Sequence, residues 1–254
     1  MTDFINLRGK VTLITGASRG IGKATAIFFA RAGSDLVLNY LRNEKQAQKV
    51  ASLAKAEGVQ AEVFKADVSS RAQCKRMVDF TIKKFGKIDI LVNNAGIWKF
   101  APIDRMSQAQ LKETLKVNLE SIFYLTTLVV PVMKKQKQGN IIYISSTAGQ
   151  RGEANHSHYA ASKGAIISLS KSLSTELAPY NIRVNCVAPG WVDTDMSHSS
   201  LVGKDKDWIL NQIPLGRAAQ AEEIAGAILF LASDLATFIT GEIINVNGGA
   251  VLCG

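Results

Sequence analysis

Residues 15–22 read Thr-Gly-Ala-Ser-Arg-Gly-Ile-Gly ("TGASRGIG"), directly after the apolar run "VTLIT" and at the start of a helical segment near 21–32. Glycines allow the backbone to turn sharply and to approach a bound group closely. The amino end of the helix adds free N–H groups and a dipole that favours a pyrophosphate. A purely structural strand-to-helix turn is the alternative, but the strand–turn–helix context favours dinucleotide binding.

The same alternation of strand and helix continues along the chain. Buried strands are predicted at the apolar runs "VTLIT", "DLVLNY", "AEVFKA", "IDILVN", "NIIYIS", "IRVNCVA" and "EIINVN". Helical segments lie between them near 21–32, 43–57, 70–85, 107–136, 158–178 and 221–233. This alternation predicts right-handed crossovers between parallel strands. We therefore expect one α/β domain over residues 1–254, a Rossmann-type doubly wound sheet of about seven parallel strands with helices on both faces.

The composition is ordinary for a globular protein, with 47% hydrophobic and 20% charged residues in 254. The apolar runs fall short of the roughly 20 residues of a membrane span, and the start of the chain shows no secretory-signal pattern. Cys74, Cys186 and Cys253 have no metal-like spacing, which favours a reducing compartment. We expect a cytoplasmic protein with no membrane partner and no metal.

The net charge of +9 is carried by lysines scattered through helical segments such as "KKFGK" and "MKKQKQ". These segments have no basic tail and no interleaved aromatic residues of the kind that stack on nucleic acid. We interpret most of this charge as solvated helix faces and expect no nucleic-acid partner. The alternative is attraction of an anionic cofactor or an acidic partner.

The second predicted strand bears on which dinucleotide is bound. NAD-selective sites usually carry an acid at the end of this strand, where it binds the ribose hydroxyls, but here Asn39 and Tyr40 stand at that place. Arg19 in the glycine-rich turn and Arg42 after the strand can hold a 2′-phosphate through charge-assisted hydrogen bonds. Solvated surface arginines are the alternative. We therefore expect NADP(H), with NAD(H) less favoured.

In the stretch "SHYAASK", Tyr159 and Lys163 lie four residues apart and so share one helical face. A phenol has a pKa of about 10, and a nearby ammonium stabilises the phenolate and lowers this pKa. Such a pair alone also arises by chance. Ser146, however, follows the strand "NIIYIS" at the end where ligands bind, and its hydroxyl can hold a carbonyl oxygen beside the phenol.

Two further features point to the same site. "NNAG", residues 93–96, ends the fourth predicted strand and indicates close approach of the backbone to a ligand. Asn118 lies on an apolar stripe of the 107–136 helix, where a buried amide needs a hydrogen-bond partner. The residues that we expect to form this stripe are Leu111, Leu115, Leu119, Ile122 and Phe123.

Taken in order and spacing, "TGASRGIG", "NNAG", Asn118, Ser146, "YAASK" and "PGWVDT" resemble the short-chain dehydrogenase/reductase family over essentially the whole chain. The resemblance implies that Tyr159 donates a proton to a substrate carbonyl while the nicotinamide delivers hydride. It implies that Lys163 lowers the tyrosine pKa and binds the nicotinamide ribose. Ser146 would orient the carbonyl, and Asn118 would hold a water in a proton relay, a satisfied core amide being the alternative.

The resemblance also implies a set of cofactor-binding positions. The glycine-rich turn would meet the pyrophosphate and adenosine, Asp67 the adenine, and Asn94 the ribose, although Asp67 can instead cap the next helix. The full predicted set is Gly16, Ser18, Arg19, Gly20, Ile21, Gly22, Asn39, Tyr40, Arg42, Asp67, Val68, Asn94, Ala95, Gly96, Tyr159, Lys163, Pro189, Gly190, Val192 and Thr194.

The segments "LVLNYLRNE", "PLGRAAQAEEIAGAILFLASD" and "ITGEIINVNGG" most resemble 3-oxoacyl-[acyl-carrier-protein] reductases. This implies reduction of 3-oxoacyl thioesters to 3-hydroxyacyl thioesters, as in fatty acid biosynthesis. Lys137 matches a basic position that meets the acidic carrier protein at the mouth of the site, whereas Tyr180 stands where arginine is expected.

The alternative function is the same catalytic machinery acting on a sugar, cyclic ketone or xenobiotic carbonyl. A non-catalytic nucleotide-binding sensor is least favoured, because no catalytic position is missing.

Two predictions concern the surroundings of the site. Residues 195–216 form an insertion after the sixth strand, which we expect to cover the substrate. The aromatic residues Trp98, Phe100, Trp191 and Trp208 are expected near the same pocket.

Small and apolar residues of the fourth and fifth helices, together with the resemblance, imply a homotetramer. Burial of these residues inside one subunit is the alternative.

Overall fold

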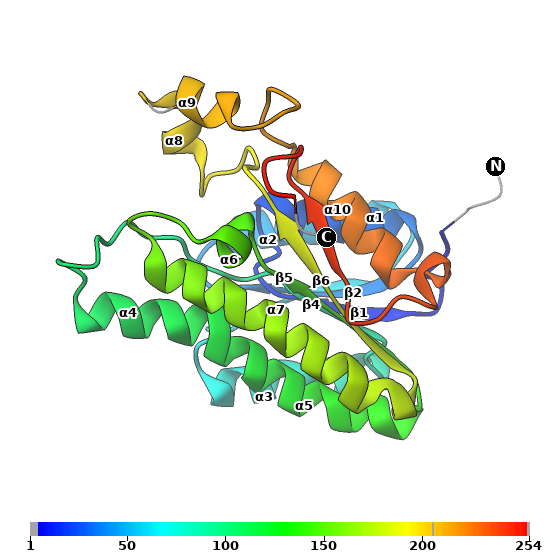
Figure 1. Ribbon diagram of the computed structural model, residues 1–254. Helices are drawn as coiled ribbons and strands as arrows, with labels where there is room; N and C mark the ends of the chain where they lie inside the picture. The colour runs from blue at the N-terminus through cyan, green and yellow to red at the C-terminus, as the bar shows by residue number, and fades with distance from the viewer. Residues whose placement is uncertain (1–4, 205, 253–254) are drawn as a thin grey trace.

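A computed structural model describes residues 5–204 and 206–252. Seven parallel strands form one sheet in the order β3-β2-β1-β4-β5-β6-β7 (Figure 1). The strands are β1 (Val11–Ile14), β2 (Asp35–Tyr40), β3 (Ala61–Lys65), β4 (Ile90–Asn93), β5 (Gly139–Ile144), β6 (Ile182–Pro189) and β7 (Ile243–Val246). The predicted Rossmann-type sheet is therefore confirmed.

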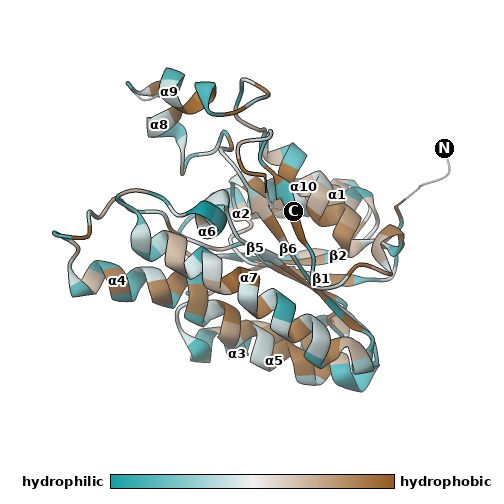
Figure 2. Ribbon diagram, viewed as in Figure 1, coloured by the Kyte–Doolittle hydropathy of each residue, from teal (hydrophilic) through white to brown (hydrophobic). Residues whose placement is uncertain are grey.

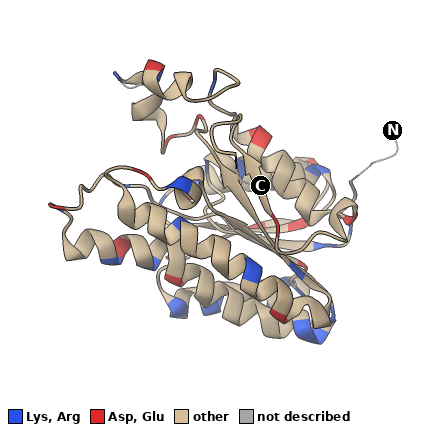
Figure 3. Ribbon diagram, viewed as in Figure 1, with Lys and Arg blue, Asp and Glu red and all other residues tan. Residues whose placement is uncertain are grey.

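Helices cover both faces of the sheet (Figure 1). One face carries α1 (Gly20–Arg31), α2 (Glu44–Ala56) and α10 (Ala221–Ala232). The other carries α3 (Arg71–Phe85), α4 (Gln108–Leu115), α5 (Ser121–Gln136) and α7 (Ser157–Leu177). Figure 3 shows Lys and Arg distributed over helices of both layers rather than gathered in one stripe.

Two hydrophobic cores, one on each side of the sheet, hold these layers together. Successive strand residues face opposite sides, so Leu13 belongs to the core under α3, α5 and α7, whereas Ile14 belongs to the core under α1, α2 and α10. Figure 2 shows apolar residues along the strands and on the helix surfaces that meet them. Because both faces of a parallel sheet are buried, its strands read as continuous apolar runs.

The sheet topology creates a crevice between β1 and β4. The chain winds outward from β1 through β2 to β3 and then returns to pair β4 with the other side of β1. Ligands of open α/β sheets bind outside the carboxyl ends of the strands at such a switch point. The glycine-rich turn follows β1 and "NNAG" overlaps the end of β4, so both lie at this crevice.

The helix from residue 108 to 136 departs from the prediction in two ways. A π-helical segment, Lys116–Glu120, separates α4 from α5. The stripe prediction is partly wrong, because Leu111 and Phe123 are 38% and 46% exposed whereas Ile122 is buried. The π segment changes which residues face the core, since it winds the helix with a wider repeat. The capping box of Ser107 and Gln110 is confirmed.

This helical stretch is long and apolar enough to cross a membrane, judged by length and composition alone. Part of its apolar surface nevertheless belongs to the protein core, because Leu125, Val129 and Met133 are buried against the sheet. The helix passes this test through its length and mean hydropathy and not through an uninterrupted apolar run, and its buried residues make it a core helix.

Short helices that the sequence pattern missed lie around the carboxyl edge of the sheet. They are α6 (Thr147–Arg151), α8 (His198–Val202) and α9 (Lys206–Asn211). In the predicted insertion, Leu201, Ile209 and Ile213 form a small core. Figure 1 shows α8 and α9 standing above the end of β6. Helices of five or six residues have too few turns to produce a visible hydrophobic period.

Candidate active site

The turn after β1 has the geometry of a cradle for a bound group. Gly16 and Gly20 adopt positive φ angles of 63° and 51°, a region that side chains with a Cβ disfavour. A Cβ on Gly22 would collide with the carbonyl oxygen of Gly16 and lie 2.6 Å from Nδ2 of Asn94. Glycine is therefore required at these positions for the loop to pack as it does.

The end of β4 holds this turn in place. The side-chain amide of Asn94 donates hydrogen bonds to the carbonyl oxygens of Thr15 (2.9 Å) and Gly16 (3.2 Å). The backbone N–H groups of Asn94 and Ala95 both donate to Oγ1 of Thr15, at 2.9 and 3.0 Å. The structure thus brings "NNAG" and the glycine-rich turn together, and it uses the Asn94 side chain to brace the loop.

The side chain of Asn39, near the end of β2, is held inside the protein. Its side chain is 2% exposed, and Oδ1 accepts a hydrogen bond from the N–H of Gly16 at 3.2 Å. Its Nδ2 donates to the carbonyl oxygen of Ala66 at 2.9 Å. Tyr40 is also buried, at 5% exposure. These side chains face inward because β2 is covered on both faces, and the cofactor contacts of Asn39 and Tyr40 stay a prediction.

The predicted phosphate-binding arginines remain at the surface. Arg42 is exposed, and Arg19 forms an ion pair with Asp195 at 3.0 Å, with both side chains 68% exposed. This pair links the glycine-rich turn to the insertion after β6. An ion pair so exposed contributes about 0–1 kcal/mol, so Asp195 leaves Arg19 available to a stronger anionic partner.

Other predicted cofactor positions lie along the same edge. Oδ1 of Asp67 accepts hydrogen bonds from the backbone N–H and hydroxyl of Ser69, at 2.9 and 2.7 Å. This carboxylate therefore closes the turn before α3, whose N-cap is Ser70. Val68 is buried, Ser18 is half-buried, and Ile21 packs against the core.

The end of β6 reaches the glycine-rich turn from the other side. The N–H of Gly190, after Pro189, donates to the carbonyl oxygen of Val246 at 3.0 Å. Val192 is buried, and its backbone bridges to Ala219. A Cβ on Gly20 would lie 3.2 Å from Cγ2 of Thr194. Thr194 therefore stands beside the glycine-rich turn, and its contact with the nicotinamide end stays a prediction.

Lys163 is buried at the centre of the site. The side chain rises from α7, and Nζ donates a hydrogen bond to the carbonyl oxygen of Ile144, the last residue of β5, at 2.7 Å. Burial lowers the pKa of Lys163 from 10.5 to about 8, because a desolvated ammonium loses its hydration. The neighbouring Ser145 hydroxyl donates to the backbone carbonyl of Lys163 at 2.7 Å and fixes this turn of α7 against β5.

Tyr159 lies one helical turn before Lys163, and Nζ of Lys163 is 5.8 Å from the centroid of its ring. Burial raises the pKa of Tyr159 to about 12, while interaction with the Ser146 hydroxyl opposes this rise. The expected lowering of the tyrosine pKa by Lys163 is not found, because desolvation dominates and the ammonium is directed to Ile144. Ser146 is the N-cap of α6, and its hydroxyl accepts from the N–H of Ala148 at 3.1 Å.

Asn118 lies in the π-helical segment and is fully buried. Its Oδ1 accepts from the N–H of Ile97 at 2.8 Å, and its Nδ2 donates to the carbonyl oxygen of Ile97 at 2.9 Å and to Oγ of Ser162 at 3.3 Å. A Cβ on Gly96 would lie 3.4 Å from Oδ1 of Asn118 and 3.6 Å from Nζ of Lys163. The amide therefore joins the loop after β4 to α7 beside Lys163.

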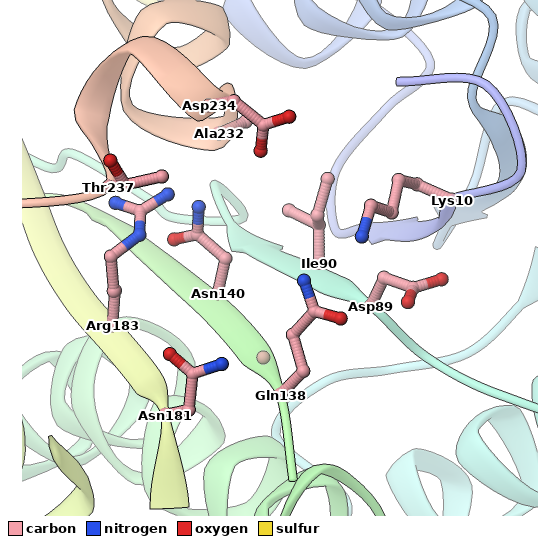
Figure 4. Close-up of a pocket in the computed structure, with 11 residues that line it drawn as sticks. Lys10, Asp89, Ile90, Gln138, Asn140, Asn181, Arg183, Ala232, Asp234 and Thr237 are labelled. Carbon is pink, nitrogen blue, oxygen red and sulfur yellow. The ribbon is translucent and has the colours of Figure 1, made fainter. Parts of the chain in front are cut away.

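A polar cavity of about 130 Å³ lies elsewhere, at the amino ends of β4, β5 and β6 (Figure 4). The guanidinium of Arg183 already donates to the carbonyl oxygens of Leu231 (2.8 Å) and Ile239 (3.2 Å). Asp89 accepts from the N–H of Val11 at 2.8 Å. Tyr159 and Lys163 meet the opposite edge of the sheet, so this cavity is separate from the site described above.

A family model described as enoyl-(acyl carrier protein) reductase matches residues 16–251. A solved structure from Brucella melitensis, described as a short-chain dehydrogenase/reductase of the glucose/ribitol dehydrogenase type, superposes with a TM-score of 0.90. It is 36% identical and covers 98% of this chain and 99% of its own. The chain belongs to the short-chain dehydrogenase/reductase family.

Other short-chain dehydrogenases/reductases match over nearly the full length. A 3-oxoacyl-[acyl-carrier-protein] reductase FabG from Thermotoga maritima is 43% identical over 98% of this chain and 100% of its own length. A 3-oxoacyl-[acyl-carrier-protein] reductase from Synechocystis is 40% identical over 97% and 98%. The structure of a 7α-hydroxysteroid dehydrogenase complexed with NADH and 7-oxo glycochenodeoxycholic acid has a TM-score of 0.93, is 38% identical, and covers 99% of this chain and 98% of its own.

Some residues of this short-chain dehydrogenase/reductase site were missed by sequence reasoning. Glu153 and His156 contact the predicted Trp98, the carboxylate through a 3.1 Å hydrogen bond and the imidazole by stacking. Gly149 is a second example, because a Cβ there would lie 2.6 Å from the carbonyl carbon of Lys163. The only sequence signal for either was closeness to Ser146 and Tyr159 along the chain.

Proposed function

We propose that this short-chain dehydrogenase/reductase is an NADP(H)-dependent reductase that converts 3-oxoacyl-[acyl-carrier-protein] thioesters to 3-hydroxyacyl thioesters. The observation that carries the proposal is 43% identity, over the whole of its length, to a relative that bears this name. The placement of Ser146, Tyr159 and Lys163 at one edge of the sheet supports the reaction type.

Tyr159 is the proposed proton donor. With a pKa of about 12 the phenol is protonated at neutral pH, which is the form that a reductase needs in order to donate. The Ser146 hydroxyl, which interacts with the phenol, orients the substrate carbonyl oxygen toward it. When bound, the reduced nicotinamide supplies the hydride to the carbonyl carbon.

Lys163 is proposed to restore the proton on Tyr159 and to bind the nicotinamide ribose. Its pKa of about 8 allows proton exchange near neutral pH, which an unperturbed lysine does poorly. Asn118 is proposed to position the loop that carries Gly96 beside Lys163. The predicted water-holding role of Asn118 stays a prediction, because its side-chain amide is occupied by Ile97 and Ser162.

The glycine-rich turn fits a dinucleotide. Gly22 leaves space that a Cβ would fill, and the turn ends at the amino terminus of the twelve-residue helix α1. Arg19 and Arg42 are exposed beside it, and the buried Asn39 offers no carboxylate for ribose hydroxyls. These features support NADP(H) over NAD(H) as the cofactor.

The acyl carrier protein as partner, a homotetramer and a cytoplasmic setting complete the proposal. The predicted carrier-protein positions Lys137 and Tyr180 follow the carboxyl ends of α5 and α7. They therefore lie at the opposite edge of the sheet from Tyr159, not at the mouth of the same chain's site. Helices run antiparallel to the strands that they connect, so these positions would meet a carrier protein at the mouth of a site only through a second subunit, and their role stays a prediction.

The test is a substrate panel with purified protein and NADPH. We expect acetoacetyl thioesters to be reduced faster than sugars and simple cyclic ketones. Rapid reduction of a cyclic ketone without reduction of acetoacetyl thioesters would instead support the second candidate, a ketone or hydroxysteroid dehydrogenase. The likeness to the 7α-hydroxysteroid dehydrogenase structure and the 63% exposed Phe100 favour including such ketones.

A further inference from the structure

Three loops at the carboxyl edge of the sheet contribute an aromatic cluster. The rings of Trp98, after β4, and His156, before α7, are stacked with centroids 4.4 Å apart and an interplanar angle of 11°. Trp191, after β6, meets Trp98 edge-on at 5.8 Å. Phe100 meets His156 edge-on at 5.7 Å. We call these four rings the aromatic wall.

A carboxylate is built into this wall. Oε1 of Glu153 accepts a hydrogen bond from the indole N–H of Trp98 at 3.1 Å and lies 3.6 Å from Nδ1 of His156. The Glu153 side chain is 25% exposed. It lies between α6, which begins after Ser146, and α7, which carries Tyr159. The hydrogen bond from the indole N–H of Trp98 fixes the position of the Glu153 carboxylate.

Glu153 is joined to the start of the helix that carries Tyr159, because it lies 3.6 Å from Nδ1 of His156, the N-cap residue of α7. The negative charge of Glu153 contributes to the raised pKa of Tyr159, which is expected when an anion stands near a phenol that would become a phenolate. Burial raises the pKa of Glu153, while His156, the hydrogen bond from Trp98 and Arg151 act in the opposite direction and favour its ionised form. A substrate whose ketone oxygen meets Tyr159 would therefore be exposed to the negative electrostatic potential of the Glu153 carboxylate.

This potential distinguishes two forms of a 3-oxoacyl compound. In a thioester the group two carbons from the ketone is uncharged, whereas in the free 3-oxo acid it is a carboxylate. We propose that Glu153, fixed by Trp98, is a specificity-determining residue that disfavours free 3-oxo acids and so selects neutral thioesters. This inference rests on the proposed function. It adds that the pocket disfavours a substrate that carries a negative charge two carbons from the ketone.

The test compares kcat/KM for acetoacetate with kcat/KM for the acetoacetyl thioester of N-acetylcysteamine, with NADPH. In Glu153→Gln the amide oxygen can still accept from Trp98, so the wall is kept and only the charge is removed. We expect the acetoacetate-to-thioester ratio to rise about tenfold or more, as for loss of one close charge pair in a partly desolvated site. Glu153→Ala provides a second uncharged variant in case the first does not fold.

Glu57→Gln is the matched control, because it removes the same charge after the carboxyl end of α2, at the opposite edge of the sheet. Its ratio should equal that of the wild type. An unchanged ratio in both Glu153 variants would overturn the inference while leaving the proposed function intact. If the wild type does not reduce the thioester at all, the proposed function fails, and the inference built on it fails with it.

Discussion

The ammonium of Lys163 donates a hydrogen bond to the carbonyl oxygen of Ile144 across 2.7 Å. This bond joins α7 to the carboxyl end of β5 and holds a cation inside the protein, where Lys163 is 4% exposed. A buried cation costs free energy unless it is paired, and no carboxylate pairs with it among residues 5–204 and 206–252. Burying Lys163 therefore lowers the stability of the fold and provides a group that can exchange protons near neutral pH.

This cost makes stability depend on pH. The pKa of Lys163 falls from 10.5 to about 8 on folding, so between these values the unfolded chain binds more protons, and the free energy of unfolding rises with pH. Lys163→Met lacks this term. From pH 7 to pH 9.5 the wild type should therefore gain up to about 2 kcal/mol relative to the variant.

Urea unfolding of both proteins at the two pH values measures this difference. The buried thiols of Cys74 and Cys186, whose pKa values burial raises to about 11 and about 12, act in the opposite direction. They are present in both proteins and cancel in the comparison. A relative stability that stays constant from pH 7 to pH 9.5 would show that the ammonium is not buried as described.

Tyr159→Phe should reduce kcat by roughly 10²–10⁴-fold, because it removes the proposed proton donor while keeping the ring. The dissociation constant for NADPH, followed by its fluorescence, should stay within about twofold of the wild type, since the phenol supplies chemistry rather than most of the affinity. Substantial residual turnover would exclude Tyr159 as the donor.

Arg19→Ala combined with Arg42→Ala should raise KM for NADPH about tenfold or more, with a much smaller effect on NADH, because charge-assisted hydrogen bonds to a 2′-phosphate are lost. Arg31→Ala is the control, as this exposed arginine pairs with Glu57 away from the glycine-rich turn. Equal changes for the two cofactors would place the phosphate contact elsewhere.

Gly149→Ala tests the packing of α6 on α7. The added Cβ would lie 2.6 Å from the carbonyl carbon of Lys163 and 2.8 Å from the backbone nitrogen of Gly164. Because these are backbone atoms, α7 must shift, and we expect a loss of about 1–3 kcal/mol in the free energy of unfolding together with lower kcat.

Gly226→Ala is the matched substitution for this prediction. Gly226 lies inside α10, and a Cβ there meets nothing within 4 Å. Alanine should therefore stabilise the helix by about 0.5–1 kcal/mol. If chemical denaturation gives the two variants the same stability change, the close approach at Gly149 is not a constraint.

The strands and their order along the chain were open to prediction because the central strands are buried on both faces and read as apolar runs. The run "DLVLNY" coincides with β2, Asp35–Tyr40. Tyr159 and Lys163 were likewise predictable as neighbours, because helical geometry alone places residues four apart on one face. The inward direction of the Asn39 side chain was not open to prediction, because an amide at a strand end can face a ligand or the interior, and only the neighbouring strands decide which.

What the sequence by itself determined is local: strand runs, the glycine-rich turn, the capping box at Ser107 and the spacing of Tyr159 from Lys163. Only the tertiary structure decided that Arg19 meets Asp195, that Trp98 holds Glu153, and that desolvation raises the pKa of Tyr159. These relationships depend on which strands are adjacent and how much water is excluded between their loops. Periodicity describes the surroundings of one element, whereas a distance or a pKa depends on all the elements that surround a group.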